Sequence, residues 1–362
     1  MSSNLEHALS GRSTNRPQLP LNKGEVPLGS EYAQLKRNLE LEALFARQPL
    51  YYILTVSVTL AALAASVTIV VSTKLIGLQL LNAVFLGFVF CQLSYVVHDA
   101  GHGQIFRSSR KNQLLGTLVT SLVLGMSYKY WHQSHNRHHA NPNHVDLDPD
   151  IEVSMMAFTE EQAQAKTGLS RLITMYQAYL FVPMLCFDSF RRRKESIEFL
   201  FRSKIKEEII LLAAHYTLVG MFFSASPGLQ NAILIFFIQQ ASYGLFVASV
   251  FAPNHKGMPI LHRGAQMGFL RSQAITTRNI RSNLLTDFWF GALNFQIEHH
   301  LFPNMPRNKL RESQPLVRAF CATRDIPYNE TGILDSYRQT LSYLHRIGAP
   351  LRRRDSDETE YC

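Results

Sequence analysis

Trp131-His132-Gln133-Ser134-His135-Asn136-Arg137-His138-His139 is the stretch around which the rest of this sequence is organised. If the stretch is helical, His135 meets His138 and His139 three and four residues later, so three imidazoles share one helix face. Neutral imidazole nitrogens are common ligands of Fe, Zn, Cu and Ni. The stretch therefore predicts a metal site.

Two further histidine clusters repeat this spacing. Box one contains His98 and His102, four residues apart; box two is 135–139; box three is Gln296-Ile297-Glu298-His299-His300, with glutamine in the first place. Seven of the 14 histidines fall in these boxes, and His255 follows a later apolar run. A catalytic zinc keeps three protein ligands and a structural zinc four, so eight imidazoles are enough for two metal ions.

The apolar residues lie in long runs, which indicates a membrane protein. We expect four transmembrane helices, since each run approaches the ~20 residues that cross a bilayer; their ranges are 50–72, 75–97, 209–223 and 229–251. The runs form two hairpins whose short turns face away from the histidines. The segment 113–126 is too short to cross comfortably and is expected to be interfacial or re-entrant. A span at 172–190 would separate box three from the other boxes, so we exclude it.

Charge and cysteine content favour a membrane protein with its working side in the cytosol. The formal net charge is +9, but the sequence shows no nucleic-acid-binding motif. The two outer turns contain only Lys74, whereas almost every other basic residue is on the histidine side, as the positive-inside rule requires. The four cysteines have no CxxC spacing, so neither a disulfide framework nor a thiolate metal site is indicated.

Outside the spans the sequence suggests a few further features. Residues 1–30 are expected to be a disordered arm, 31–350 one membrane domain, and 351–362 a charged tail. The segment 31–47 has leucines at roughly helical spacing, which suits a helix lying at the membrane interface. We expect one helical stretch over about 277–301 to carry box three. Asp146, Asp148 and Asp150 lack the glycine and closing glutamate of a calcium loop, so imidazole support or a helix cap is preferred.

The three boxes together resemble those of the integral-membrane fatty acid desaturases. The similarity covers about residues 50 to 345 and includes the order of the boxes, the spans between them and the Leu301-Phe302-Pro303 trailer. Glutamine at position 296 replaces a histidine found in many relatives and is similar to front-end and some bacterial acyl desaturases. No cytochrome b5 module is recognisable at either end of the sequence.

The resemblance implies an all-α integral membrane fold, with four spans and a cytosolic helical cap that holds a non-haem di-iron site. It implies an oxidoreductase that uses O2 and two electrons to introduce a double bond into a fatty acyl chain, with formation of water. Seven box histidines are the implied iron ligands, and His255 is our candidate for the ligand missing at Gln296. The implied metal ligands are His98, His102, His135, His138, His139, His255, His299 and His300. Residues expected to support them are Asp99, His132, Asn254, Gln296 and Glu298.

The expected partners follow from this chemistry. The acyl substrate is lipid-bound or CoA-bound, and electrons are expected from a separate donor of ferredoxin or cytochrome b5 type with its reductase. Membrane lipids surround the spans, and no nucleic-acid partner is expected.

One alternative function is that of a related di-iron hydroxylase or ketolase of alkanes, sterols or carotenoids. A non-catalytic metal-binding membrane protein such as a transporter is less favoured, because its ligands would lie near the bilayer midplane rather than at span ends.

Overall fold

The computed structural model describes residues 28–225, 228–265 and 267–359, and nearly all regular structure in these ranges is helical. Four helices are long and apolar enough to cross a membrane. They are α2 (Pro49–Ser72), α3 (Ile76–Gly101), α10 (Lys206–Ala225) and α11 (Leu229–His255). The prediction of an all-α fold with four candidate spans is therefore confirmed.

Polar contacts fix the first hairpin within its apolar surroundings. The Oγ of Ser66 on α2 donates to Oδ1 of Asn82 on α3 at 2.8 Å, and the Gln79 side-chain amide donates to the carbonyls of Val70 and Thr73 at the turn. Helix α3 also packs along α11, the last span. Both α3 and α11 continue past their apolar runs, so His98 and His255 lie on the ends of spans rather than in loops.

The shorter apolar segments form helices that are not among the candidate spans of the described residues. Segment 113–126 becomes α4 (Ser109–Thr117) and a π-helix, η1 (Leu118–Leu124), which ends at Gly125 with φ of 72°. Segment 172–190 is divided between α7 (Gly168–Met175), α8 (Gln177–Leu185) and α9 (Asp188–Ser203). The topology therefore leaves the three boxes at one end of the spans.

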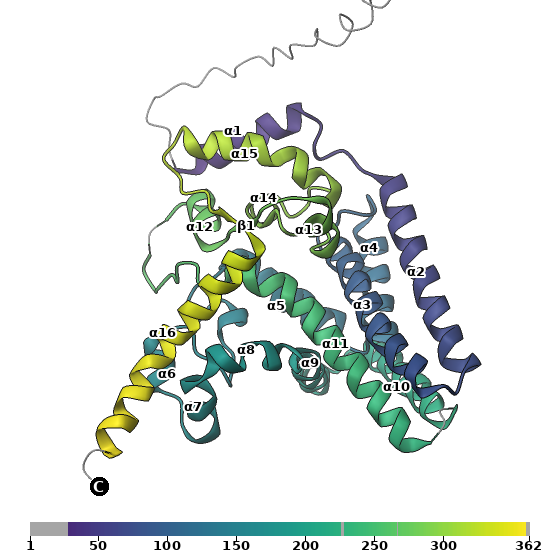
Figure 1. The fold of residues 1–362 in the computed structure, drawn as a ribbon. Coiled ribbons are helices and arrows are strands. Elements are labelled where there is room, and N and C mark those ends of the chain that lie inside the picture. Colours follow the sequence, from purple (N-terminus) through teal and green to yellow (C-terminus); the bar gives the residue numbers. More distant parts are fainter. Residues whose placement is uncertain (1–27, 226–227, 266, 360–362) are drawn as a thin grey trace, which may run out of the picture.

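The remaining helices gather at that end (Figure 1). They are α1 (Leu28–Leu41), α5 (Tyr128–Ala140), η2 (Pro149–Ile151), α6 (Glu160–Gln164), α12 (Phe269–Thr276), α13 (Leu284–Trp289), α14 (Gln296–Leu301), η3 (Arg307–Lys309), α15 (Leu310–Ala322) and α16 (Ile333–Thr359). Leu35 and Leu39 of α1 are almost completely buried in a core shared with α12, α14 and α15. Most of the predicted leucine face of this helix therefore packs on protein, while Leu41 is 80% exposed; the interfacial position stays a prediction.

The expectation of one helical stretch over 277–301 is also wrong. The segment contains strand β1 (Asn279–Ile280), paired in parallel with β2 (Glu330–Thr331), and then the separate helices α13 and α14. The Asn283 side chain caps α13 by accepting from the Thr286 N–H, and Gly291 and Ala292 have φ of 57° and 64°. These left-handed residues end one helix and turn the chain before the next.

The predicted N-terminal arm falls almost entirely in residues 1–27, outside the described residues. Helix α16 runs to Thr359, so helical backbone extends into the segment predicted as a charged tail.

Candidate metal centre

The structure brings eight histidines from four helices into two adjoining groups. The ligand nitrogens within each group lie within 4.8 Å of one another. The first group draws on α3, on His102 directly after it, and on α5 and α14; the second draws on α5, α11 and α14. The first consists of His98, His102, His135, His139 and His299, and the second of His138, His255 and His300.

Box two contributes to both groups because of its helical spacing. His135 and His139 lie one turn apart and face the first group, while His138 faces the second. Ser127 stabilises the start of α5 by accepting a hydrogen bond from the Tyr130 N–H at 3.1 Å. One short helix can therefore hold two metal ions next to each other.

The spacing of the ring nitrogens fits metal ligation. Nε2 to Nε2 distances are 2.9 Å for His102–His135, 3.0 Å for His98–His299, 3.1 Å for both His135–His139 and His139–His299, and 3.3 Å for His138–His255. Two nitrogens bound at ~2.1 Å to one ion and at right angles lie about 3.0 Å apart. The observed spacing is therefore that of neighbouring ligands on a shared ion.

Contacts of the opposite ring nitrogen set the tautomer of three histidines. Nδ1 of His98 lies 3.3 Å from Asp99, Nδ1 of His138 lies 3.0 Å from Asp148, and Nδ1 of His300 lies 2.9 Å from Oε1 of Gln273. Each partner is an oxygen acceptor, so Nδ1 carries the proton and Nε2 directs a lone pair toward the centre. Nε2 of His300 is buried and has no hydrogen-bond partner within the described ranges. Converging lone pairs repel one another unless a cation lies between them, so the donor set fits metal ions.

The electrostatic surroundings favour the neutral form of most of these imidazoles, with His138 as the exception. Burial, followed by the neighbouring histidines, lowers the pKa of His102, His135, His139, His299 and His300 well below the ordinary value. Burial alone would lower the pKa of His138 too, but Asp148 and Asp150 raise it above the ordinary value. A neutral imidazole is the form that binds a metal.

His255 at the end of α11 lies next to Gln296 of box three. Nε2 of His255 lies 3.3 Å from Nε2 of His138, and the Gln296 side-chain amide donates to it at 3.0 Å. Oε1 of Gln296 accepts from Nδ2 of Asn254 at 3.0 Å, and the same Nδ2 donates to the Leu293 carbonyl. Asn254 therefore turns the amide nitrogen of Gln296, and not its oxygen, toward His255. The Gln296 N–H and a metal ion would use the same Nε2 lone pair of His255, so this hydrogen bond has to open before His255 can bind an ion.

Of the other predicted supporting residues, Asp99 contacts a histidine of the centre, whereas Glu298 and His132 have other partners. Asp99 lies beside His98, with its other oxygen 3.0 Å from Nε of Arg307. Glu298 instead accepts from Asn279 at 2.7 Å and Tyr328 at 2.6 Å, so it anchors α14 to β1 and the segment before β2. Burial raises the pKa of Glu298 to about 7. His132 hydrogen-bonds with Asn136 on the outer side of α5 and belongs to neither histidine group.

Two supporting residues were missed from the sequence, Gln273 and Arg307. Both lie far along the chain from the histidines they serve, and no spacing rule connects them. Asp148 fits both predicted roles, because it meets Nδ1 of His138 and also caps η2 by accepting from the Asp150 N–H at 2.9 Å.

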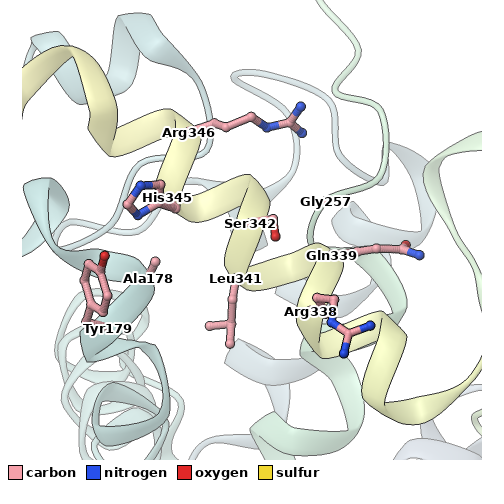
Figure 2. Close-up of a pocket in the computed structure, with 9 residues that line it drawn as sticks. All are labelled: Ala178, Tyr179, Gly257, Arg338, Gln339, Leu341, Ser342, His345 and Arg346. Atoms are coloured by element: carbon pink, nitrogen blue, oxygen red, sulfur yellow. The ribbon is translucent and has the colours of Figure 1, made fainter.

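A cavity of about 750 Å³ lies between α8 and α16 (Figure 2). Its lining includes Tyr179, Gly257, Arg338, His345 and Arg346. Tyr179 is 68% exposed and Arg338 is paired with Asp335 at the surface. The cavity is therefore an open surface feature that contains none of the eight histidines.

Comparison with known proteins agrees with the arrangement of the boxes. The family model for fatty acid desaturases matches residues 76–332. A Delta(8)-fatty-acid desaturase of Euglena gracilis is 30% identical over 328 residues, which cover 86% of this chain and 76% of the relative. An acyl-lipid (9-3)-desaturase of Physcomitrium patens is 28% identical, over 88% of this chain and 62% of the relative, and a Delta(8)-fatty-acid desaturase of Borago officinalis is 27% identical, over 91% and 77%. The chain belongs to the fatty acid desaturase family.

Proposed function

We propose that this protein is an O2-dependent fatty acyl desaturase with a non-haem di-iron centre at the cytosolic face of a membrane. The observation that carries the proposal is the pair of histidine groups at one end of four candidate spans, in a chain of the desaturase family. The three relatives named above are desaturases, and nothing in the geometry favours the hydroxylase or ketolase alternative.

The proposed ligand assignment follows the two histidine groups. His98, His102, His135, His139 and His299 would hold one iron, and His138, His255 and His300 the other. When bound, the irons supply the oxidising chemistry that uses O2 and two electrons. Burial favours the neutral form of most of these imidazoles, and Asp99, Asp148 and Gln273 fix the tautomers of His98, His138 and His300.

Burial of the ligands divides the site into a closed part and an accessible part. His98, His138, His139, His255, His299 and His300 are buried, whereas His102 and His135 are only partly buried. The Trp131 ring stacks on His135, with centroids 4.9 Å apart. We infer that an acyl chain approaches at this accessible side, where an indole ring offers it an apolar wall and helps exclude water.

The position of the site next to a membrane indicates the acyl substrate and the electron donor. An acyl chain already lies among the lipids that surround the spans, so it exchanges one apolar environment for another when it binds. The proposed carrier is a membrane lipid or CoA. The cytosolic position of the site rests on the basic residues of the histidine side, and electrons would come from a ferredoxin-like or cytochrome-b5-like donor.

The test is expression in a host of known lipid composition, followed by gas chromatography of fatty acid methyl esters. We expect a new unsaturated acid with the wild-type chain, and its loss with His138→Ala. The matched control is His262→Ala, an exposed histidine outside both groups, which keeps the product. A hydroxylated product, or no product from an iron-loaded chain with a working donor, would overturn the proposal.

A further inference from the structure

Helix α13, between the last span and box three, presents a largely exposed apolar face. Leu284 is 84% exposed, Leu285 74% and Phe288 60%. On its opposite side Thr286 is buried, and the following Phe290 is completely buried. Three large apolar side chains exposed together on so short a helix indicate a surface that contacts something other than water.

The neighbours of α13 show how deep it lies. The Phe288 ring is 5.9 Å from that of Phe88 on α3, and the Trp289 ring is 5.4 Å from that of Phe246 on α11. Phe88 precedes His98 by ten residues and Phe246 precedes His255 by nine, which at 1.5 Å per residue is about 15 Å along each helix. The Phe288 and Trp289 rings therefore reach from the histidine end toward the middle of the apolar runs, while the Trp289 carbonyl meets the Tyr95 hydroxyl only three residues before His98.

The pairing of α2 with α3 gives the same depth. Because Ser66 faces Asn82, Phe88 is level with about Leu60, in the middle of the uncharged first span. The surface next to Phe88 is apolar as well, since Leu81 is 70% exposed and Phe85 41%. The exposed face of α13 thus continues the lipid-facing surface of α3.

The polar groups of α13 are satisfied as a helix in hydrocarbon requires. The Trp289 carbonyl accepts from the Tyr95 hydroxyl at 2.7 Å, and the Gly291 carbonyl accepts from Nη1 of Arg307 at 3.0 Å. Asp287 accepts from Ser282 at 2.9 Å and Asn294 at 2.8 Å, and its Oδ2 lies 3.5 Å from Nη1 of Arg311, whose side chain is 62% exposed. This side of α13 therefore faces the cap, opposite the exposed leucines. These donors satisfy the carbonyls at the C-terminal end of α13, which lies at the level of box one, so that this end needs no water where it borders the hydrocarbon.

We propose that α13 is a re-entrant membrane element whose Leu284, Leu285 and Phe288 side chains contact the acyl chains of bilayer lipids. The link from the last span to box three then passes through the hydrocarbon layer instead of lying in the aqueous phase. Lipid chains meet the protein directly beside the segment that positions His299 and His300.

Site-directed spin labelling of the full-length chain in phosphatidylcholine vesicles tests this proposal. Nitroxides are attached at Leu285→Cys, at Leu81→Cys as the reference inside a span, and at Leu334→Cys as the matched control, in a Cys186→Ser, Cys362→Ser background. Leu334 is 79% exposed and adjoins the exposed Asp335–Arg338 ion pair. The measurement is power saturation with O2, which concentrates in hydrocarbon, and with a neutral nickel chelate, which stays in water.

The expected result is an O2-to-chelate ratio at Leu285 that matches Leu81 and exceeds that at Leu334. A ratio at Leu285 equal to that at Leu334 would overturn the proposal. A second measurement compares Leu285→Asp with Leu334→Asp in the same vesicles. Only the former lowers the unfolding temperature if α13 is inserted, since a carboxylate in hydrocarbon is costly; an equal effect of the two substitutions counts against insertion.

Discussion

At the scale of single residues, a buried ion pair connects two parts of the site that lie far apart in sequence. Asp99 adjoins His98 and is completely buried, and its Oδ2 lies 3.0 Å from Nε of Arg307, which is 3% exposed. The backbone N–H of Arg307 donates to Gln104, whose side chain donates to the Pro303 carbonyl. Arg307 therefore balances the charge of Asp99, the carboxylate that orients His98. Through Gln104 it is also connected to Pro303, in the segment that follows box three.

Arg307→Met is expected to weaken binding of one Fe²⁺. Loss of the guanidinium leaves Asp99 as an unpaired buried carboxylate, a change that typically costs about 3–5 kcal/mol of stability. Residues that orient metal ligands typically contribute about 10–100-fold to metal affinity. The measurement is anaerobic Fe²⁺ titration of the metal-free protein, together with thermal unfolding.

Arg193→Met is the control for this prediction, because Arg193 is also buried but donates to the Leu124 and Gly125 carbonyls and to Gln240. It should reduce stability and leave Fe²⁺ affinity unchanged. In an Asp99→Asn background the effect of Arg307→Met should largely disappear. Equal Fe²⁺ affinities of wild type and Arg307→Met would contradict the role given to this arginine.

The limits of sequence reasoning at this scale are visible in these residues. The histidine boxes could be found because helical spacing places their imidazoles on one face, and His255 because it ends an apolar run. Arg307 and Gln273 could not be found, because their contacts depend on how distant segments pack. Glu298 was expected next to an imidazole, but the turn of α14 directs it toward Asn279 and Tyr328.

At the scale of elements, the start of α5 is held by the first turn of a span. The Ser127 hydroxyl donates to the Glu208 carboxylate, which also accepts from the Lys129 N–H at 3.0 Å. Glu208 is 1% exposed. A carboxylate at a helix N-terminus interacts favourably with the helix dipole as well as with its free N–H groups. The first turn of α10 therefore fixes the helix that provides ligands to both groups.

Glu208→Gln is expected to destabilise the protein by about 1.5–3 kcal/mol, the usual contribution of hydrogen bonds to a charged group. The change retains size but removes the charge that accepts from α5. Glu207→Gln is the matched control, since the neighbouring Glu207 is exposed and should change stability little. Thermal unfolding of the purified variants checks this; equal unfolding temperatures for the two substitutions would show that Glu208 does not fix α5.

Elements were predictable where an apolar run or a helical period was long. The four spans were found because a long run of apolar residues with almost no charge is typical of a helix that crosses a bilayer. The segment 277–301 was expected to be continuous helix, but Asn283 and the left-handed Gly291 and Ala292 divide it. The burial of α1 also could not be read from its spacing, since an amphipathic helix packs equally well on lipid or on protein.

At the scale of the whole molecule, the site depends on two spans that extend beyond their apolar runs. Helices α3 and α11 pack along each other and carry His98 and His255 in their last turns, while α5 and α14 close over them. One end of the bundle thereby gathers eight imidazoles from four elements. The sequence predicted this convergence only through topology, because all three boxes had to lie on one side of the membrane.

The central claim is that two irons are held by eight histidines, with His255 replacing the ligand absent at Gln296. The most direct measurement is the iron content per chain of purified wild type and His255→Ala, with His262→Ala as the control for an exposed histidine. The account predicts two irons in the wild type and in His262→Ala, and about one in His255→Ala, because only His138 and His300 remain in the second group. Two tightly bound irons in His255→Ala, or fewer than two in the fully loaded wild type, would contradict it.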